Sequence, residues 1–249
     1  MRQKNSKLVH EIYHKATKKQ VKIIRSNNFT YRHILKYLNK YIPEKSTKEI
    51  LDIGSGAGSL SFYLAARGNH VIGIDISTKA IEESKKSSKI LNLKNISFLR
   101  ASFPDTRDLG KKFDAVIFTE VIEHLEDDKL ALRRINELLK KNGLLFLSTP
   151  SINAPLHKMG LTRKFDKEVG HLRRYTLPQL KNLLKDSDFK IIQSVKTEGI
   201  IRNFLFVNPY AGKLVRYINF FASDLTTILD DISLKIFGNS NFIIIARKK

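Results

Sequence analysis

The stretch Glu49-Ile-Leu-Asp-Ile-Gly-Ser-Gly-Ala-Gly-Ser-Leu60 combines a short apolar run with three glycines at alternate positions, Gly54, Gly56 and Gly58. The apolar run predicts a buried strand, and the residues that follow the glycines show a helical pattern. Glycines at such a junction let the backbone turn tightly and approach a ligand, because no Cβ intervenes. The stretch therefore predicts a strand, a ligand-binding loop and a helix in succession.

The spacing of the glycines narrows the kind of ligand. The pattern is Gly-x-Gly-x-Gly, whereas a dinucleotide-binding loop has Gly-x-Gly-x-x-Gly, and Ser59 stands at the last position of that pattern. A P-loop is excluded because no Gly-Lys-Ser/Thr follows. With Asp52 two positions before the first glycine, the stretch resembles the first motif of class I S-adenosylmethionine (SAM) methyltransferases. A glycine-rich turn without a ligand is the alternative.

The composition describes an ordinary globular protein with an unusual charge. Its 249 residues are 42% apolar and 28% charged, which suits one α/β domain with additions. The net charge is +21, and a field of that sign favours anionic partners such as nucleic acid, acidic lipid headgroups or phosphorylated substrates. Cysteine is absent, so neither disulfides nor thiol chemistry are available.

The N-terminal residues predict a basic arm over residues 1–28. Residues 1–25 hold eight Lys or Arg against one acid, Glu11, and both a solvated face and a partner-binding segment fit them. They lack the apolar stretch of a secretory signal. No uninterrupted apolar run reaches the ~18 residues of a membrane span. We therefore expect no transmembrane segment and a cytoplasmic protein, with peripheral membrane contact as a further option.

Strands and helices then alternate along the chain. Helices are expected at residues 29–41, 60–67, 77–91, 128–140 and 176–184, and strands at residues 49–53, 70–75, 96–100, 113–118, 144–150, 189–195 and 242–249. Short, nearly continuous apolar strands suit a parallel sheet that is covered on both faces. The predicted fold class is α/β, a Rossmann-like doubly wound sheet. The resemblance to class I methyltransferases implies seven mostly parallel strands, the last one antiparallel.

The chain is predicted to divide into a SAM-binding core at 29–198, an insert at 199–240 and a final core strand at 241–249. Apolar residues recur every three or four positions in the insert, which predicts an amphipathic helix or helix pair. Charged residues interrupt it, so it cannot span a membrane. A lid, a dimer face and an interfacial membrane helix all remain open. The interrupting residues are Arg216, Asp224, Asp230 and Asp231.

The cofactor site is expected at the carboxyl ends of the strands, where open α/β sheets bind ligands. Asp75 ends the second strand, 21 residues after Gly54, where a carboxylate can accept hydrogen bonds from both ribose hydroxyls. Related methyltransferases carry an acidic residue after the third strand, whereas this chain has Ser102, with Asp105 three positions later. The resemblance implies cofactor-binding roles for Asp52, Gly54, Ser55, Gly56, Gly58, Asp75, Ile76, Ser102, Thr119 and Arg32.

A second stretch, Phe118-Thr-Glu-Val-Ile-Glu-His-Leu125, closely resembles the ubiquinone-biosynthesis O-methyltransferases, which share a Glu-x-x-Glu-His signature after this strand. Its two glutamates and its histidine lie within one helical turn, so their side chains are expected to converge on one face. Two carboxylates and an imidazole suit a divalent cation such as Mg²⁺ or Mn²⁺. The downstream stretch Gly170-His-Leu-Arg-Arg-Tyr-Thr176 supplies a further histidine.

The same residues resemble the metal set of small-RNA 2′-O-methyltransferases. That resemblance implies metal ligands at Glu120, Glu123, His124 and His171, and such a metal would lower the pKa of the acceptor hydroxyl. Metal-free catalysis is the first alternative, with His171 as general base beside His124 and Glu120. A purely structural role is the second.

Three functions follow for comparison. The first is SAM-dependent O-methylation of a hydrophobic or anionic small molecule or a lipid-linked acceptor. The second is a metal-dependent RNA 2′-O-methyltransferase, and the third is a SAM-fold protein without catalysis. Residues 151–175 are expected to line the acceptor site. No Asn/Asp-Pro-Pro-Tyr motif of amino-methylating enzymes follows the fourth strand, which favours oxygen as the acceptor.

Overall fold

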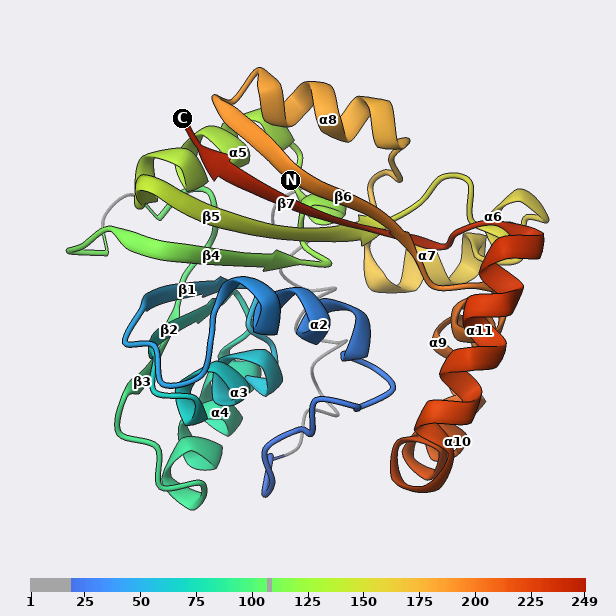
Figure 1. The fold of residues 1–249 in the computed structure, drawn as a ribbon, viewed down its shortest axis with the longest axis horizontal. Helices are drawn as coiled ribbons and strands as arrows, with labels where there is room; N and C mark the ends of the chain where they lie inside the picture. Colours follow the sequence, from blue (N-terminus) through green and yellow to red (C-terminus); the bar gives the residue numbers. More distant parts are fainter. Residues whose placement is uncertain (1–18, 107–108) are drawn as a thin grey trace.

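The computed structural model describes residues 19–106 and 109–249. Residues 1–18 of the predicted basic arm (1–28) lie outside the described residues. A seven-stranded sheet in the order β3-β2-β1-β4-β5-β7-β6 forms the centre (Figure 1). β1 to β5 pair in parallel, and β7 is antiparallel to β5 and β6. The predicted mostly parallel sheet with an inverted last strand is confirmed. The strands are β1 (Glu49–Ile53), β2 (His70–Asp75), β3 (Ile96–Arg100), β4 (Phe113–Thr119), β5 (Leu139–Pro150), β6 (Phe189–Thr197) and β7 (Asn241–Lys248).

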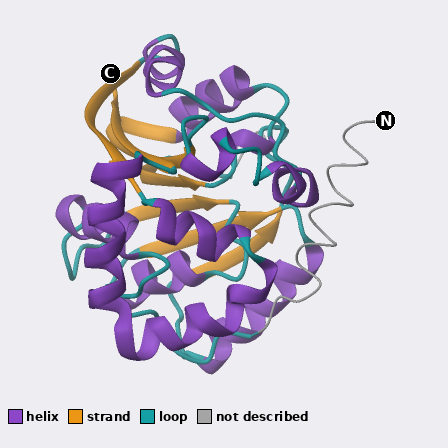
Figure 2. Cartoon of the chain, turned by 90° about the vertical axis from the view of Figure 1, so that its right-hand side faces the viewer, coloured by secondary structure: helices purple, strands orange, loops and turns teal. Residues whose placement is uncertain are grey.

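Helices cover both faces of this sheet, as the view in Figure 2 also shows. α2 and α3 bury their apolar side chains against one face, and α5 and α8 against the other. Because both faces are covered, the central strands are apolar on both sides, as the continuous runs predicted. The helices of these layers are α2 (Arg32–Tyr41), α3 (Ser59–Ala66), α4 (Thr78–Ile90), α5 (Asp128–Leu138) and α8 (Leu177–Lys185).

Local capping fixes where several helices begin. The Ser77 hydroxyl accepts a hydrogen bond from the Ala80 amide at the start of α4. Thr176 and Gln179 form a capping box at α8, so both predicted caps are confirmed. α5 ends at Leu138, earlier than predicted, because the chain passes directly into β5, which pairs with β4 from Leu139 onward.

The connection at residues 151–175, for which no helix was expected, contains two short helices, α6 (Pro155–Lys158) and α7 (Arg163–Val169). Its two ends meet, since Ser151 and Tyr175 form an isolated parallel bridge. The whole segment is therefore a closed excursion that begins at the carboxyl end of β5 and returns there, over the edge of the sheet where ligands bind.

The insert between β6 and β7 is helical throughout most of its length. Within the insert, Arg202 is fully buried and lies 3.3 Å from the Asp230 carboxylate. The Arg202 guanidinium also stacks on the Phe29 ring, 3.8 Å from its centroid, and this contact packs the insert on the rest of the fold. No helix among the described residues is both long and apolar enough to cross a bilayer. The insert comprises α9 (Ile200–Val207), η3 (Pro209–Ala211), α10 (Gly212–Tyr217), the π-helical η4 (Ile218–Ala222) and α11 (Ser223–Phe237).

Candidate active site

A cavity of about 1030 Å³ opens at the carboxyl ends of β1, β2 and β4. The glycine loop and the residues after β4 line it from the sheet. Residues 165–174 of the excursion and the start of the insert line its other side. Parts of the chain far apart in sequence therefore meet around one space, at the edge of the sheet where sequence analysis placed the site.

The glycine loop adopts backbone geometry that a side chain would obstruct. Gly54 has φ +73°, and a Cβ there would lie 2.4 Å from a methyl carbon of Val121. Gly58 has φ +81°, and its Cβ would lie 2.8 Å from the Phe62 ring. Left-handed backbone of this kind favours glycine strongly. Gly54 and Gly56 line the cavity, whereas Gly58 lies behind it, at the start of α3.

Asp75 is held in place at the end of β2. One carboxylate oxygen accepts the Gly56 N–H at 2.8 Å, and the other accepts the Ser77 N–H at 2.8 Å. Each oxygen keeps a second lone pair, and the side chain lines the cavity. This carboxylate is therefore oriented to receive two neighbouring donors on a ligand.

Asp52 differs from Asp75 in its environment. Burial raises the pKa of Asp52 to about 6, while a hydrogen bond from the Ser61 hydroxyl opposes the rise and the nearby Asp75 adds to it. Asp52 still borders the cavity. Its Oδ2 also accepts the Ser61 hydroxyl, and this hydrogen bond joins β1 to α3.

Among the other residues predicted to bind the cofactor, Ser55, Ile76, Ser102 and Thr119 line the cavity. The Ser102 hydroxyl donates to the Asp105 carboxylate at 3.0 Å, so the two residues act as one polar unit there. Arg32 is not among the lining residues. Its guanidinium binds the Asp224 carboxylate and the Ser223 carbonyl of α11 instead.

The Glu-x-x-Glu-His stretch does not form the single helical turn that was predicted. Glu120 has φ +55°, and a short 3₁₀ helix, η2 (Ile122–His124), begins only after it. The left-handed backbone turns Glu120 toward β5 and β7. There its Oε1 accepts the Ser148 hydroxyl at 2.6 Å and the Asn241 amide at 2.9 Å. The expected convergence on one face is therefore wrong for Glu120.

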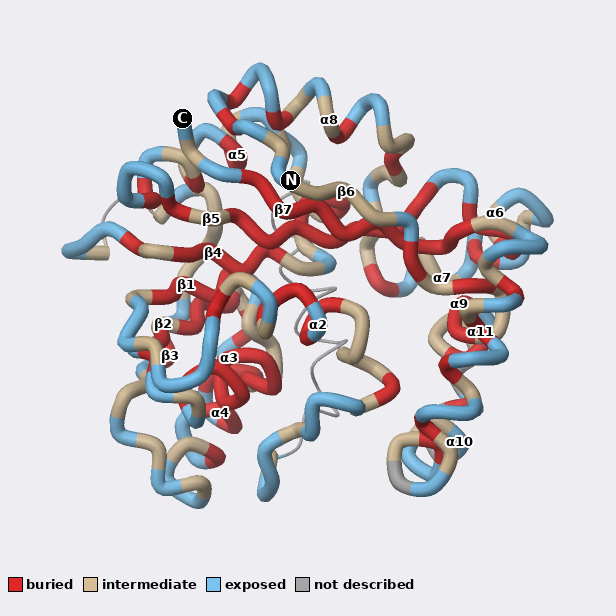
Figure 3. Tube along the Cα trace, in the orientation of Figure 1, coloured by how far each residue is buried: buried red, intermediate tan, exposed pale blue. Residues whose placement is uncertain are grey.

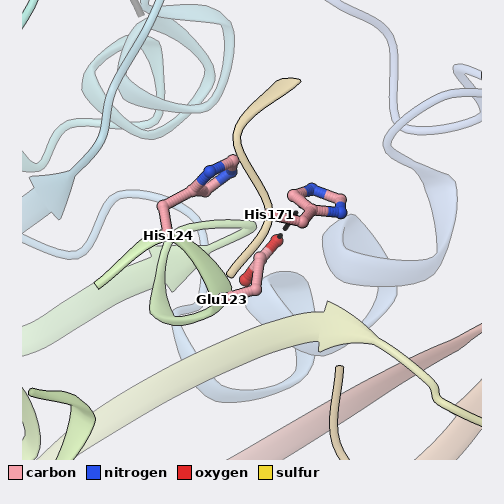
Figure 4. A group of neighbouring side chains, drawn as sticks. All are labelled: Glu123, His124 and His171. Atoms are coloured by element: carbon pink, nitrogen blue, oxygen red, sulfur yellow. Dashed lines mark ion pairs between the residues drawn. The ribbon is translucent and has the colours of Figure 1, made fainter. Parts of the chain in front are cut away.

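Glu123, His124 and His171 do converge, as Figure 4 shows. One ligand atom from each lies within 4.8 Å of the others. Glu123 is fully buried, and its Oε2 accepts the Thr149 hydroxyl at 2.9 Å. Its Oε1 has no hydrogen-bond partner among the described residues and lies 3.8 Å from Nε2 of His171. Burial and the charge of Glu120 raise the pKa of Glu123 well above its usual value.

His171 is oriented by a carboxylate that the sequence analysis missed. Its Nδ1 lies 2.9 Å from Oδ1 of Asp166, so Nδ1 donates and Nε2 is the atom left to accept a proton. Burial alone would raise the pKa of Asp166, but hydrogen bonds from His171 and Arg174 outweigh it and hold the pKa well below its usual range. Gly170, with φ +83°, ends α7 and brings the two residues together. A glycine directly before His171 was the signal available in the sequence.

His124 is fixed in the same region by the backbone. Its Nδ1 lies 3.1 Å from the Gly170 carbonyl oxygen, which makes Nδ1 the donor in that tautomer. The rings of His124 and His171 meet edge to face, with centroids 4.8 Å apart. Two imidazoles thus border the cavity side by side, and each has its Nδ1 engaged by the protein.

Residues 25–194 match the family model described as "Methyltransferase domain". The chain belongs to this methyltransferase family. A ubiquinone biosynthesis O-methyltransferase from Pelagibacter ubique is 41% identical over 107 residues, which is 43% of this chain and 43% of that protein. Another, from Bartonella quintana, is 31% identical over 156 residues, 59% of this chain and 62% of that protein. The chain thus spans 43% and 62% of the length of these two curated relatives.

The fold has close counterparts among solved structures. A phosphoethanolamine N-methyltransferase from Haemonchus contortus, solved in complex with S-adenosyl-L-methionine, superposes with a TM-score of 0.66. The two chains are 17% identical, over 88% of this chain and 52% of that one. Likeness at this identity concerns the fold alone, which is the Rossmann-like sheet of class I SAM methyltransferases.

Proposed function

We propose that this chain is a SAM-dependent methyltransferase that methylates a hydroxyl oxygen of a small, largely apolar acceptor. The observation that carries the proposal is that one cavity joins the glycine loop and Asp75 to His171. The first two features suit a nucleoside-bearing cofactor. The third suits removal of a proton from an acceptor. Similarity to proteins named ubiquinone biosynthesis O-methyltransferase supports oxygen as the methylated atom.

The residues present fit SAM as the cofactor. The ribose hydroxyls would donate to Asp75, whose carboxylate is already held in one orientation by the Gly56 and Ser77 amides. The methionine part would lie along Gly54, where a Cβ has no room. Ile76, Ser102 and Thr119 border the remaining space for the adenosine. When bound there, SAM supplies an electrophilic methyl group on a positively charged sulfur.

The chain's own residues then position the acceptor and take its proton. His171 would accept the hydroxyl proton at Nε2, because Asp166 engages Nδ1 and stabilises the imidazolium that forms. His124 would border the same hydroxyl and orient it. Glu120 is held by Ser148 and Asn241, so we assign it to the wall of the acceptor site and not to proton transfer.

The acceptor part of the cavity favours an apolar molecule. Aromatic and aliphatic side chains from the excursion, the insert and the start of α5 line it, and such surface gains free energy by burying apolar groups. Because the known relatives act in ubiquinone biosynthesis by name, a phenolic acceptor is consistent with them. The apolar lining residues are Leu125, Leu130, Phe165, Leu172, Phe206 and Val207.

A divalent cation is the alternative to His171 as a metal-free base, because Asp166 engages Nδ1 of His171 and leaves one ring nitrogen, Nε2, for either role. Glu123, His124 and His171 present oxygen and nitrogen donors of the kind Mg²⁺ or Mn²⁺ accepts, and Glu123 Oε1 is a buried atom without a partner among the described residues. These three residues would hold the ion, which would lower the pKa of the acceptor hydroxyl. Glu120 is bonded elsewhere, so the four-residue set of the RNA enzymes is incomplete. RNA 2′-O-methylation is therefore the weaker alternative.

A peripheral membrane contact is the last part of the proposal. The outer surface of α10, η4 and α11 is exposed along much of its length (Figure 3), and large apolar side chains occupy it. An interfacial helix with this surface would enter the boundary of a bilayer, and the +21 charge of the chain would favour anionic lipids. The exposed apolar residues, here called the apolar face, are Leu214, Tyr217, Phe221, Leu225, Ile228, Leu229, Ile232, Ile236 and Phe237.

Transfer of radiolabelled methyl groups from SAM to simple phenols tests the function. We expect label in a phenolic ether, and we expect His171→Ala to remove it while S-adenosylhomocysteine still binds. General-base loss of this kind costs about 10²–10⁴-fold in rate. Full activity of His171→Ala would refute the assignment of the base. Failure of S-adenosylhomocysteine to bind the unaltered protein would refute the function.

A further inference from the structure

A polar wall made by Glu120, Asn241 and Glu198 lines the same cavity. Glu120 follows β4, Glu198 follows β6 and Asn241 begins β7. Because β7 runs antiparallel to its neighbours, its first residue pairs with the last residues of β5 and β6. The three side chains are therefore brought together by the sheet itself, at the carboxyl ends of the parallel strands.

The contacts within this wall leave acceptor atoms in excess. Glu120 uses Oε1 to accept from Ser148 and Asn241, and none of the described residues donates to its Oε2. The Glu198 carboxyl group lies beside the same Asn241 amide. Two carboxyl groups thus approach one amide group that can satisfy only part of their hydrogen-bonding capacity.

Two buried amide oxygens add to this excess. Asn241 is 8% exposed and Asn203 is 7% exposed, and both line the cavity. The Oδ1 atom of each has no hydrogen-bond partner among the described residues. Buried acceptors without donors are costly, and native proteins keep few of them without a reason. A ligand rich in donors would relieve the cost.

The backbone of both glutamates is held in an unfavourable region. Glu120 has φ +55° and Glu198 has φ +61°, and residues other than glycine seldom adopt such backbone angles. Strain of this kind tends to persist where a side chain must face a ligand. Both residues line the cavity, and the Asn241 amide neighbours both carboxyl groups.

The charge of the cavity is opposite to that of the whole chain. Although the net charge is +21, Arg174 is the one Lys or Arg among the described residues that line the cavity. Burial raises the pKa of Glu198 to about 8, with repulsion from Glu120 and Asp230 adding to it and Arg202 opposing. A cation beside the wall would favour the ionised carboxylate. The acidic lining residues are Asp52, Asp75, Asp105, Glu120, Glu126, Asp127 and Glu198.

We propose that the methyl acceptor carries a protonated amine that binds between Glu120 and Glu198. An ammonium group has three N–H donors and a positive charge, which match Oε2 of Glu120, the Glu198 carboxylate and a nearby amide oxygen. The proposal rests on the proposed methyl transfer and names the chemical class of its acceptor. It replaces the expectation, drawn from the net charge, that the acceptor is anionic.

Equilibrium binding of three phenols in saturating S-adenosylhomocysteine tests this proposal without requiring turnover. Tyramine is cationic, para-cresol is neutral and para-hydroxybenzoate is anionic, while all three share the phenol. We expect tyramine to bind about tenfold or more tightly than para-cresol, as a charge-assisted hydrogen bond allows. Para-hydroxybenzoate should bind more weakly than either.

Glu198→Gln and Glu120→Gln should each remove the preference for tyramine and leave the affinity for para-cresol unchanged. Glu126→Gln is the matched control, since it neutralises another carboxylate that lines the cavity and should keep the preference. Equal affinity for tyramine and para-cresol, or binding of neither, would overturn the proposal. The proposal would also be overturned if the variants weakened the binding of S-adenosylhomocysteine and left the binding of tyramine unchanged, because the wall would then bind the cofactor's own ammonium group. Loss of S-adenosylhomocysteine binding in the unaltered protein would instead refute the proposed function.

Discussion

His171 donates its Nδ1 proton to Asp166 across 2.9 Å, and the same carboxylate receives the Arg174 guanidinium. The arrangement fixes one tautomer of the histidine and leaves Nε2 beside Glu123 and the cavity. A histidine held in this way can take up a proton without reorienting. The pair is the feature of the site that most clearly separates a proton acceptor from a histidine used only for packing.

Asp166→Asn should lower kcat by about 10²-fold, because an amide can neither fix this tautomer nor stabilise the imidazolium. The KM for SAM should change little, since Asp166 is not among the cavity-lining residues. Steady-state kinetics measure both. Glu168→Gln on the same helix is the control, as its exposed side chain pairs with Lys164 and with no other side chain of the described residues. An Asp166→Asn variant as active as the control would contradict the role of the pair.

Mn²⁺ titration calorimetry tests the cation. If Glu123, His124 and His171 hold the ion, Glu123→Gln should abolish Mn²⁺ binding, while Glu120→Gln should retain it because Glu120 is bonded to Ser148 and Asn241. EDTA should then reduce methyl transfer by the unaltered protein. Activity that is indifferent to EDTA, together with no Mn²⁺ binding, would remove the cation and leave His171 as a metal-free base.

The buried Asp52 makes stability depend on pH in a defined direction. Burial raises its pKa from 3.8 to about 6 in the folded state, so the folded protein keeps a proton that the unfolded chain releases. Stability from this group is therefore complete below pH 4 and is lost as pH rises to about 6. Asp52→Asn should gain roughly 2–3 kcal/mol of unfolding free energy relative to the unaltered protein between those pH values. Urea unfolding curves measure the difference, and curves that stay parallel across the range would contradict it.

The apolar face should determine membrane binding. Ile228→Asp combined with Ile232→Asp places two charges where exposed aliphatic side chains now stand on α11. We expect co-sedimentation with anionic vesicles to fall at least about tenfold, since each aliphatic group contributes roughly 1.5–3 kcal/mol when buried. Ile90→Asp, at an exposed isoleucine on α4, is the control. Equal sedimentation of both variants would show that this face does not touch lipid.

Most of the fold could be predicted because strand and helix patterns are local. The apolar runs of β1, β2 and β4 are continuous, and Ser77 and Thr176 mark helix starts through their own hydroxyls. The inverted position of β7 came from resemblance, since antiparallel pairing between distant segments leaves no local signal. The helices of residues 151–175 were missed because each is only a few residues long.

The site was less predictable where backbone geometry decides direction. Glu120 was expected to join Glu123 on one helical turn, but its φ of +55° sends the side chain to Asn241, more than a hundred residues away in sequence. Arg32 was expected to bind the cofactor, yet its guanidinium forms an ion pair with Asp224 of the insert. Asp166 was not predicted because its role depends on the turn at Gly170. A long-range contact determined the outcome for Glu120 and Arg32, whereas a local turn determined it for Asp166.

Calorimetric titration with S-adenosylhomocysteine tests whether the cavity that joins the glycine loop to Asp75 holds the methyl donor. We expect one binding site on the unaltered protein. We also expect affinity at least about tenfold weaker for Asp75→Asn, which loses charged hydrogen bonds to the ribose. Glu126→Gln should bind as the unaltered protein does. An absence of binding, or equal binding by Asp75→Asn, would contradict the claim that this cavity holds the methyl donor.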